Sequence, residues 1–231
     1  MNVRSIRFAA ILSAAGTLVG IAALYAADAA AQGAGATASR VESSNRQLLN
    51  SERIAARFGN YGIEVLAGDS RERVSNLYSE ANGERTCRTF AVVRYPAAID
   101  SAVAAEHDEI VRGGSIGAVF AAHGWQVRKT NLRYFEIDAP ARVAGLMRVA
   151  PGTRLAAHAY ELDVVKDGRS LEYALLVEIH HPDYLKRDDL LAIYGAADAS
   201  GHEAAVEDLV GAALTAAGAT NDAVPSPTGT R

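Results

Sequence analysis

"RLAAHAYELDVVKDGRSLEYALLVEIHH", residues 154–181, is the stretch that decides the fold. Two segments of alternating apolar and polar residues flank Asp167 and Gly168, and an Asp-Gly pair in that position is a strong signal for a tight two-residue β-turn. If these two residues form the turn, Lys166 pairs with Arg169, and alternation fixes every other pair along the strands. The stretch therefore predicts a long antiparallel hairpin.

Alternation also assigns the side chains of this hairpin to two faces. One face collects apolar residues with two histidines at its outer end: Tyr160, Leu162, Val164, Leu171, Tyr173, Leu175, Val177 and Ile179, then His158 and His181. The other face collects charged and polar residues: Glu161, Asp163, Glu172, Glu178 and His180. We expect a core face and an acidic surface face, with the adjacent His180 and His181 on opposite sides of the sheet.

Residues 73–95 predict another hairpin, because Asn82-Gly83 is the dipeptide best suited to the same kind of turn. In chain order this is the first hairpin, and residues 154–181 form the second. Alternation from this turn places Arg73, Arg88 and Arg94 on one face of the hairpin. The first hairpin therefore carries a basic face where the second carries an acidic one.

The two charged faces suggest a pairing. Asp163 lies directly across from Glu172 in the predicted hairpin, and like charges in that position are destabilising unless a cation is near. We expect the arginine face of the first hairpin to supply this cation, within one sheet or between two subunits. The alternative is that both charged faces are only solvated.

The remaining segments surround the hairpins with helices and short strands. We expect helices from Ser44 to about Gly59, at 98–111, from Ser115 to about 122, from 139 to Pro151, at 183–195 and at 200–217, the last capped by Ser200 and Glu203. Short strands follow the glycines at 62 and 124. The sequence predicts an α+β fold, with helices packed on an antiparallel sheet built from two hairpins and short strands.

The order of elements favours an internal duplication of about 45–112 and 115–195. Helix, glycine, strand, hairpin, proline and helix follow one another in both segments. The stretches 54–65 and 116–127 also match at Ile, Ala, Phe, Gly and Val.

The N-terminus predicts export. Arg4 and Arg7 precede an apolar stretch, and Ala29 and Ala31 form a small-residue cleavage site. Residues 1–31 are therefore expected to be an export signal, or an uncleaved N-terminal anchor, since the apolar stretch is long. An Ala/Gly linker at 32–43, one domain at 44–217 and a disordered tail at 218–231 complete the predicted organisation.

Composition limits the partners. Cys87 is the single cysteine, which excludes an internal disulfide. Removal of residues 1–31 takes away two arginines and one aspartate, leaving 21 basic and 26 acidic side chains, a net charge of −5. This balance argues against nucleic acid and against membrane contact beyond an N-terminal anchor. A protein or small-molecule ligand remains, and a homodimer stays open.

Three residues are candidate nucleophiles or bases, and each has a structural alternative. Ser115 lies in "GGSIG", the G-x-S-x-G pattern of serine hydrolases, but that motif needs a strand before it and the preceding residues predict a helix, so Ser115 is expected to cap the next helix. Cys87 is expected to be a small buried thiol. His180 is expected to lie on the acidic surface.

Glu178 and His180 share a face and are candidate metal ligands. A usual site needs a third ligand, and the predicted faces supply none. No cofactor-binding motif is present, and we expect no cofactor. The sequence therefore favours a non-catalytic binding or interaction module of the periplasm or the extracellular space. The alternatives are an exported hydrolase that uses Ser115 and a metal-dependent enzyme that uses Glu178 and His180.

Overall fold

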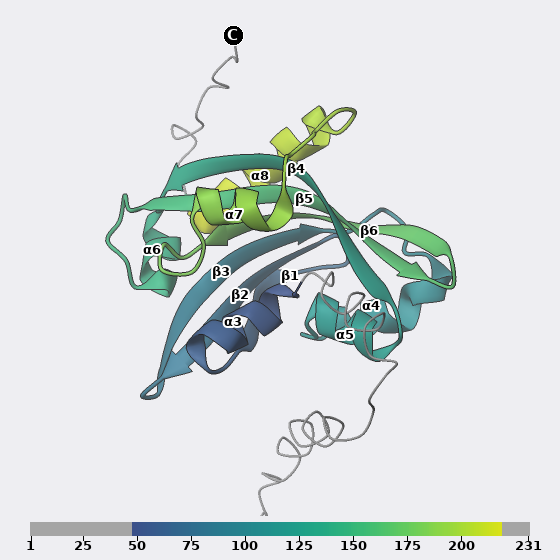
Figure 1. Cartoon of the computed structure of the whole chain (residues 1–231), viewed down its shortest axis with the longest axis horizontal. Coiled ribbons are helices and arrows are strands. Elements are labelled where there is room, and N and C mark those ends of the chain that lie inside the picture. The colour runs from purple at the N-terminus through teal and green to yellow at the C-terminus, as the bar shows by residue number, and fades with distance from the viewer. Residues whose placement is uncertain (1–47, 219–231) are drawn as a thin grey trace, which may run out of the picture. The chain divides into compact units, whose positions relative to one another are not determined.

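The computed structural model describes residues 48–218, which form a six-stranded antiparallel sheet with helices on both faces (Figure 1). The strands are β1 (Gly62–Gly68), β2 (Glu72–Ala81), β3 (Glu84–Arg94), β4 (Gln126–Asp138), β5 (Arg154–Lys166) and β6 (Arg169–His180). The helices are α3 (Asn50–Phe58), α4 (Ala104–Val111), α5 (Ile116–Ala122), α6 (Ala141–Met147), α7 (Arg187–Tyr194) and α8 (Glu203–Ala217), with a 3-10 turn at Ser101–Val103. The predicted α+β fold is confirmed.

Several predicted segments lie outside the described residues. These are the export signal, the linker and the tail from residue 219 onward. Among the helices of residues 48–218, none combines the length and apolar character needed to cross a membrane.

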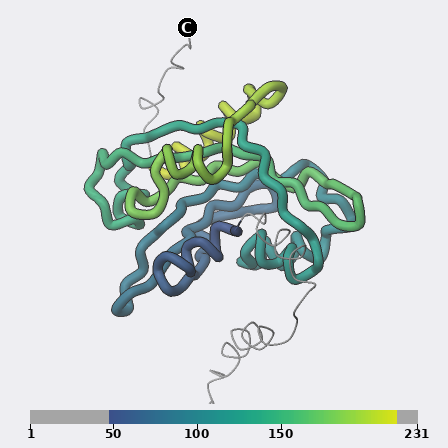
Figure 2. Tube along the Cα trace, in the orientation of Figure 1, coloured from purple at the N-terminus to yellow at the C-terminus, as the bar shows by residue number. Residues whose placement is uncertain are grey.

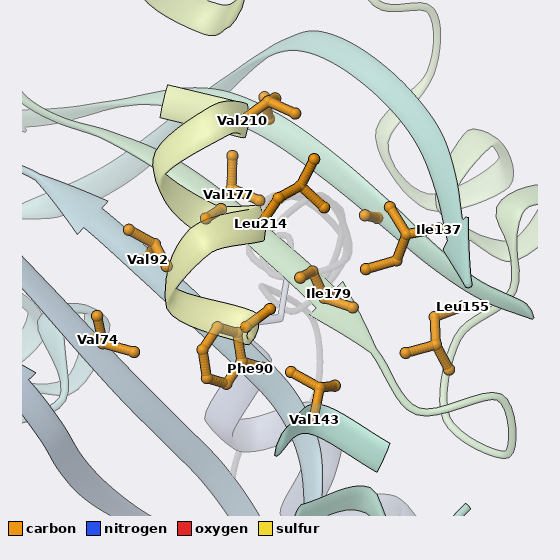
Figure 3. Close-up of a cluster of buried hydrophobic side chains, with 14 of the residues drawn as sticks. Val74, Phe90, Val92, Ile137, Val143, Leu155, Val177, Ile179, Val210 and Leu214 are labelled. Carbon is orange, nitrogen blue, oxygen red and sulfur yellow. The ribbon is translucent and has the colours of Figure 1, made fainter. Parts of the chain in front are cut away.

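The sheet divides the described residues into three layers. Helices α6 and α8 pack on one face against β3 and β6, where the largest apolar cluster includes Phe90, Val177, Ile179 and Leu214 (Figure 3). Helices α3, α4, α5 and α7 cover the other face. Both faces of the central strands are therefore buried, which the sequence analysis did not anticipate.

The two halves of the sheet are arranged alike. The strand order β1-β2-β3-β6-β5-β4 places the two hairpins in the centre, where β3 pairs with β6, and puts β1 and β4 at the edges (Figure 2). Each half contains a helix, a strand and a hairpin in the same chain order, as expected from the proposed duplication.

Both predicted turns are confirmed. Asn82 and Gly83 have φ angles of 54° and 78°, and Asp167 and Gly168 have φ angles of 51° and 77°. Two consecutive positive φ angles define the tight turn that Asn-Gly and Asp-Gly favour. Lys166 accordingly pairs with Arg169.

A β-bulge in each hairpin overturns the predicted faces. In the second hairpin Asp163 pairs with Glu172, as expected, but Leu162 pairs with Ala174, so Tyr173 is an extra residue on β6. An extra residue moves every later side chain of its strand to the opposite face. The strict alternation predicted from the turn is therefore wrong beyond Tyr173.

The bulge changes the surroundings of the histidines. His158 pairs with Glu178 and lies on the same face as His180, beneath α3 and α7. This face is no acidic surface, because Glu178 is 4% exposed and His180 is fully buried. His181 does point the other way, toward Met147 of α6.

The predicted basic face is also wrong, for the same reason. Arg88 is the extra residue of the first hairpin, since Tyr78 pairs with Cys87 and Leu77 with Thr89. Arg73 and Arg94 consequently contact different layers. Arg73 reaches the α4–α5 connection, while Arg94 forms ion pairs with Glu72 and with Asp208 of α8.

The cation beside Asp163 comes from β4. Arg128 lies across from Asp163, and its Nη2 is 2.6 Å from Oδ2 of that carboxylate. The expectation that the first hairpin supplies this charge is therefore wrong.

Several helix boundaries differ from the prediction. Helix α3 begins at Asn50, after the non-helical residues 48 and 49, so the predicted start at Ser44 is wrong. Helix α4 begins at Ala104 after the 3-10 turn, and α6 ends at Met147, before Pro151.

Helix α7 begins at Arg187 instead of directly after Pro182, and the Asp189 carboxylate accepts the backbone N–H of Lys186. Helix α8 follows His202, and the predicted cap Ser200 instead donates its hydroxyl to Asp198.

Candidate functional site

A buried polar network lies on the face of the sheet that α3 and α7 cover. Its members come from four elements: Asn50 of α3, Lys129 of β4, His158 of β5, and Glu178 and His180 of β6. Cross-strand pairing sets His158 opposite Glu178, and a spacing of two residues puts Glu178 and His180 on the same face of β6. The network therefore follows from the register that the bulge imposes.

Glu178 is the centre of this network. Its Oε2 accepts a hydrogen bond from Nε2 of His158 at 3.0 Å and lies 3.7 Å from Nζ of Lys129. Its Oε1 accepts a hydrogen bond from the side-chain amide of Asn50 at 3.0 Å. Both carboxylate oxygens are thus used, which a charge at this depth requires.

A second chain of hydrogen bonds holds His180. Its Nδ1 is 3.1 Å from the Thr89 hydroxyl, which also accepts a hydrogen bond from Asn50 at 3.2 Å. Asn50 in turn accepts a hydrogen bond from the Tyr184 hydroxyl at 2.5 Å. The amide of Asn50 therefore links the carboxylate of Glu178 to the imidazole of His180.

Lys129 brings a positive charge into the interior. Its Nζ lies 4.2 Å from the centre of the Tyr160 ring and 5.4 Å from that of Tyr194. Aromatic faces attract cations, most strongly where water is excluded. The ammonium group is therefore stabilised by Glu178 on one side and by two rings on the other.

These surroundings fix the charges of the network. Burial alone would raise the pKa of Glu178, but Lys129 and the hydrogen bond from His158 hold that pKa well below its usual range. Burial alone would lower the pKa of Lys129, but the carboxylate of Glu178 raises it. The two groups thus form a charged pair.

The two histidines are neutral. Burial, followed by the nearby His158, lowers the pKa of His180 to about 3. Burial also lowers the pKa of His158, against the opposing influence of Glu178. Neutral imidazoles leave a nitrogen lone pair available for a hydrogen bond or for a metal ion.

A cavity of about 60 Å³ adjoins the network. All six strands contribute to its wall, and Asn50, Ser115 and Gly117 close it from the helical side. Most of the wall is apolar: Leu49, Ile63, Leu77, Ala91, Val93, Ile116, Val127, Leu162 and Leu176. The polar part includes Tyr61, Arg73, Lys129, Tyr160 and Glu178.

Arg73 differs from the other charged groups of the wall. It is 4% exposed, and its Nη1 donates to the backbone carbonyls of Ile110 and Gly114 at 2.7 and 2.9 Å. No carboxylate of residues 48–218 forms an ion pair with it, and its Nε has no hydrogen-bond partner there. Within residues 48–218, the cavity wall therefore holds a buried cation whose charge no carboxylate balances.

Three of the network's residues could hold a metal ion. One nitrogen of His158, one of His180 and one oxygen of Glu178 lie within 4.8 Å of one another. The candidate ligands Glu178 and His180 are thus brought together with a third side chain that the sequence analysis assigned to the opposite face.

The other candidates lie apart from this group. Ser115 lines the cavity at the start of α5, but helix α4 precedes it instead of a strand, and no hydrogen bond joins its hydroxyl to a histidine within the described residues. Cys87 is fully buried beneath the opposite layer, and burial raises the pKa of its thiol far above its usual range.

Sequence reasoning missed Arg73 and Lys129 as site residues, and it placed His158 on the wrong face. Lys129 is a single lysine in a strand whose charged residues are all exposed or half-buried, so the sequence pattern gives no reason to expect its ammonium group beside Glu178. Apolar residues occur at both odd and even positions of β6, so the hydrophobic pattern alone did not fix which side chains belong to which face. This ambiguity was a sign that the predicted register could be wrong.

Comparisons with known proteins give no family. No protein-family model matches the sequence, and no curated protein matches it. Among solved structures, the chain is similar to a GntR-family transcriptional regulator from Enterococcus faecalis V583, at 11% identity over 55% of this chain and 93% of that chain, with a TM-score of 0.35.

A putative transcriptional regulator from Streptomyces coelicolor is similar at 17% identity over 58% of this chain and 79% of that chain, with a TM-score of 0.30. The C-terminal domain of YurK from Bacillus subtilis is similar at 13% identity, covering 57% and 82% of the two chains, with a TM-score of 0.32. Similarity at this level does not identify a function for the chain.

Proposed function

We propose that this protein is an exported binding module that takes up a small organic carboxylate in the cavity between the sheet and helices α3 and α5. The observation that carries the proposal is the guanidinium of Arg73, buried in the cavity wall without a carboxylate partner among the described residues. A buried charge without a counter-ion is costly, and an anionic ligand would supply that counter-ion.

Charge and size restrict the ligand. Lys129 is already balanced by Glu178, so the wall carries a net charge of one from Arg73. A cavity needs about 10–15 Å³ to hold one water molecule, so a cavity of about 60 Å³ suits a ligand the size of a few waters. The largely apolar wall favours a carboxylate with a short apolar tail over inorganic phosphate.

Localisation and absence of catalysis belong to the same proposal. The N-terminal pattern of Arg4, Arg7, Ala29 and Ala31 supports action in the periplasm or outside the cell. The competing function is hydrolysis by Ser115, which also lines the cavity. A serine nucleophile needs a base within hydrogen-bond reach, and the described residues offer Ser115 no such histidine.

A thermal-shift screen tests the proposal. Acetate, propionate, butyrate and phosphate are added to the full chain, and unfolding is followed by the fluorescence of Trp125. A bound carboxylate at about 100 times its Kd should raise Tm by about 5–10 °C. The Arg73→Met variant should bind about 10–100-fold more weakly, because a charge-assisted hydrogen bond contributes about 1.5–3 kcal/mol.

Matched variants separate binding from other effects. Arg94→Met removes an arginine on the opposite face and should leave carboxylate binding unchanged. Ser115→Leu should block the cavity, whereas Ser115→Ala should not. Wild-type carboxylate affinity in both Arg73→Met and Ser115→Leu would refute the binding site, and covalent labelling of Ser115 by a fluorophosphonate would favour the hydrolase.

A further inference from the structure

The second feature of this face is the cluster of His158, Glu178 and His180. Their ligand atoms lie within 4.8 Å of one another, and the two imidazole rings are 5.2 Å apart between centroids. Atoms that bind one divalent ion at about 2.0–2.2 Å lie at most about 4.4 Å apart, so the three ligand atoms are close to the spacing that a metal site needs. The three side chains come from the paired strands β5 and β6, which fixes their backbones firmly.

Two nitrogen atoms of this cluster have no hydrogen-bond partner. Nε2 of His180 and Nδ1 of His158 are both buried and unpaired within the described residues. An unsatisfied buried polar atom costs about 1–3 kcal/mol, so each of them needs an explanation. If Nε2 of His180 donates its lone pair to a metal ion, this cost is removed on one side of the cluster.

We infer that His158, Glu178 and His180 bind one divalent first-row transition-metal ion, with Zn²⁺ as the simplest case. Two imidazoles and one carboxylate form a donor set that such ions favour. The outer contacts also fit, because Thr89 holds Nδ1 of His180 and Asn50 holds the second oxygen of Glu178. Partners of this kind orient metal ligands.

Metal binding rearranges two existing interactions. Nε2 of His158 now donates its proton to Oε2 of Glu178. Because the ring is neutral, metal binding through Nε2 requires this proton to move to Nδ1 of the same ring, and no proton is released. Nζ of Lys129 lies 3.7 Å from the same oxygen, so the ammonium group and the ion compete for it. The rings of Tyr160 and Tyr194 keep the ammonium stabilised when the carboxylate turns to the metal.

This competition predicts a variant that strengthens binding. Lys129→Met removes a positive charge beside the site and retains the apolar length of the side chain. We expect its affinity for Zn²⁺ to rise at least tenfold, a direction that misfolding does not produce. His180→Gln should abolish specific binding, and Thr89→Val should weaken it by about 10–100-fold, as expected for a partner that orients a ligand.

Calorimetric titration of ZnCl₂ into the chelator-treated, untagged full chain is the experiment, with Co²⁺ absorption as a second readout of coordination. His123→Gln is the control, because His123 lies 3.5 Å from Glu106 and 3.4 Å from Glu109 at the surface and could take up zinc adventitiously. We expect one ion per chain in the wild type and in His123→Gln.

Two results would overturn the inference. One is the absence of zinc binding in both the wild type and Lys129→Met. The other is binding that His180→Gln leaves unchanged while circular dichroism shows the variant folded. If that variant does not fold, the sign of the Lys129→Met effect decides. The Arg73→Met variant should bind zinc normally, so failure here is distinct from failure of the carboxylate proposal.

Discussion

Glu178 and the neutral imidazoles of His158 and His180 are buried in contact with one another, and the largely buried side chain of Lys129 adjoins them. Lys129 and Glu178 each have a partner of opposite charge, whereas among residues 48–218 the guanidinium of Arg73 has backbone carbonyls as its hydrogen-bond partners. The types of these residues alone could not predict which charges are paired inside the protein and which are not. Glu178 and His180 were correctly predicted to share one face of β6, but their burial was not predicted, because that face was expected to meet solvent.

The neutral state of His180 predicts an acid-sensitive fold. Its pKa is lowered to about 3 in the folded chain, so the unfolded chain takes up a proton as the pH falls below about 6.5 and the folded chain does not. The contribution of neutral His180 to the free energy of unfolding should therefore be fully present above about pH 6.5, and the free energy of unfolding should decrease as the pH falls below it. From pH 7 to pH 5 this one group should cost about 2 kcal/mol.

Urea unfolding of the chelated protein at both pH values, followed by the single tryptophan, measures this loss. His180→Gln should reduce it by about 2 kcal/mol. His123→Gln, which changes a histidine whose side chain is 43% exposed, should retain the full loss. An equal pH dependence in the wild type and His180→Gln would contradict a neutral buried His180.

At the scale of elements, the sequence predicted both hairpins and both turns, and it failed at the bulges. Asn-Gly and Asp-Gly carry the turn geometry in two residues, so local chemistry is sufficient there. The bulges at Arg88 and Tyr173 carry no such local mark. Both faces of these strands are buried, so apolar side chains suit either face and the hydrophobic pattern cannot fix the register.

The Asp167-Gly168 turn gives a prediction at this scale. Gly168 has a φ of 77°, where a Cβ is strained although the space around it is open. Gly168→Ala should lower the free energy of unfolding by about 1 kcal/mol. Gly145→Ala, in the middle of α6 with open space and an ordinary φ, should raise it by up to about 1 kcal/mol.

Urea unfolding of the two variants side by side is the measurement. A stabilising Gly168→Ala would mean that residues 167 and 168 do not form the turn on which the register depends.

At the scale of the described chain, the candidate site lies where the two hairpins meet. Arg73 comes from the first half, Lys129 and Glu178 from the second, and α3 and α5 begin beside the same cavity. A duplicated order of elements thus produces one shared site at the centre of the sheet. The sequence predicted the repeated order, but not that the halves carry different charged residues into one cavity.

The central claim is that this cavity takes up a small organic anion through Arg73. Fluorine NMR of trifluoroacetate tests it most directly, because exchange with a protein site broadens or shifts one resolved signal. The account predicts broadening by the wild-type chain that propionate reverses and that Arg73→Met abolishes. Equal broadening by the wild type and Arg73→Met, or none by either, would contradict it.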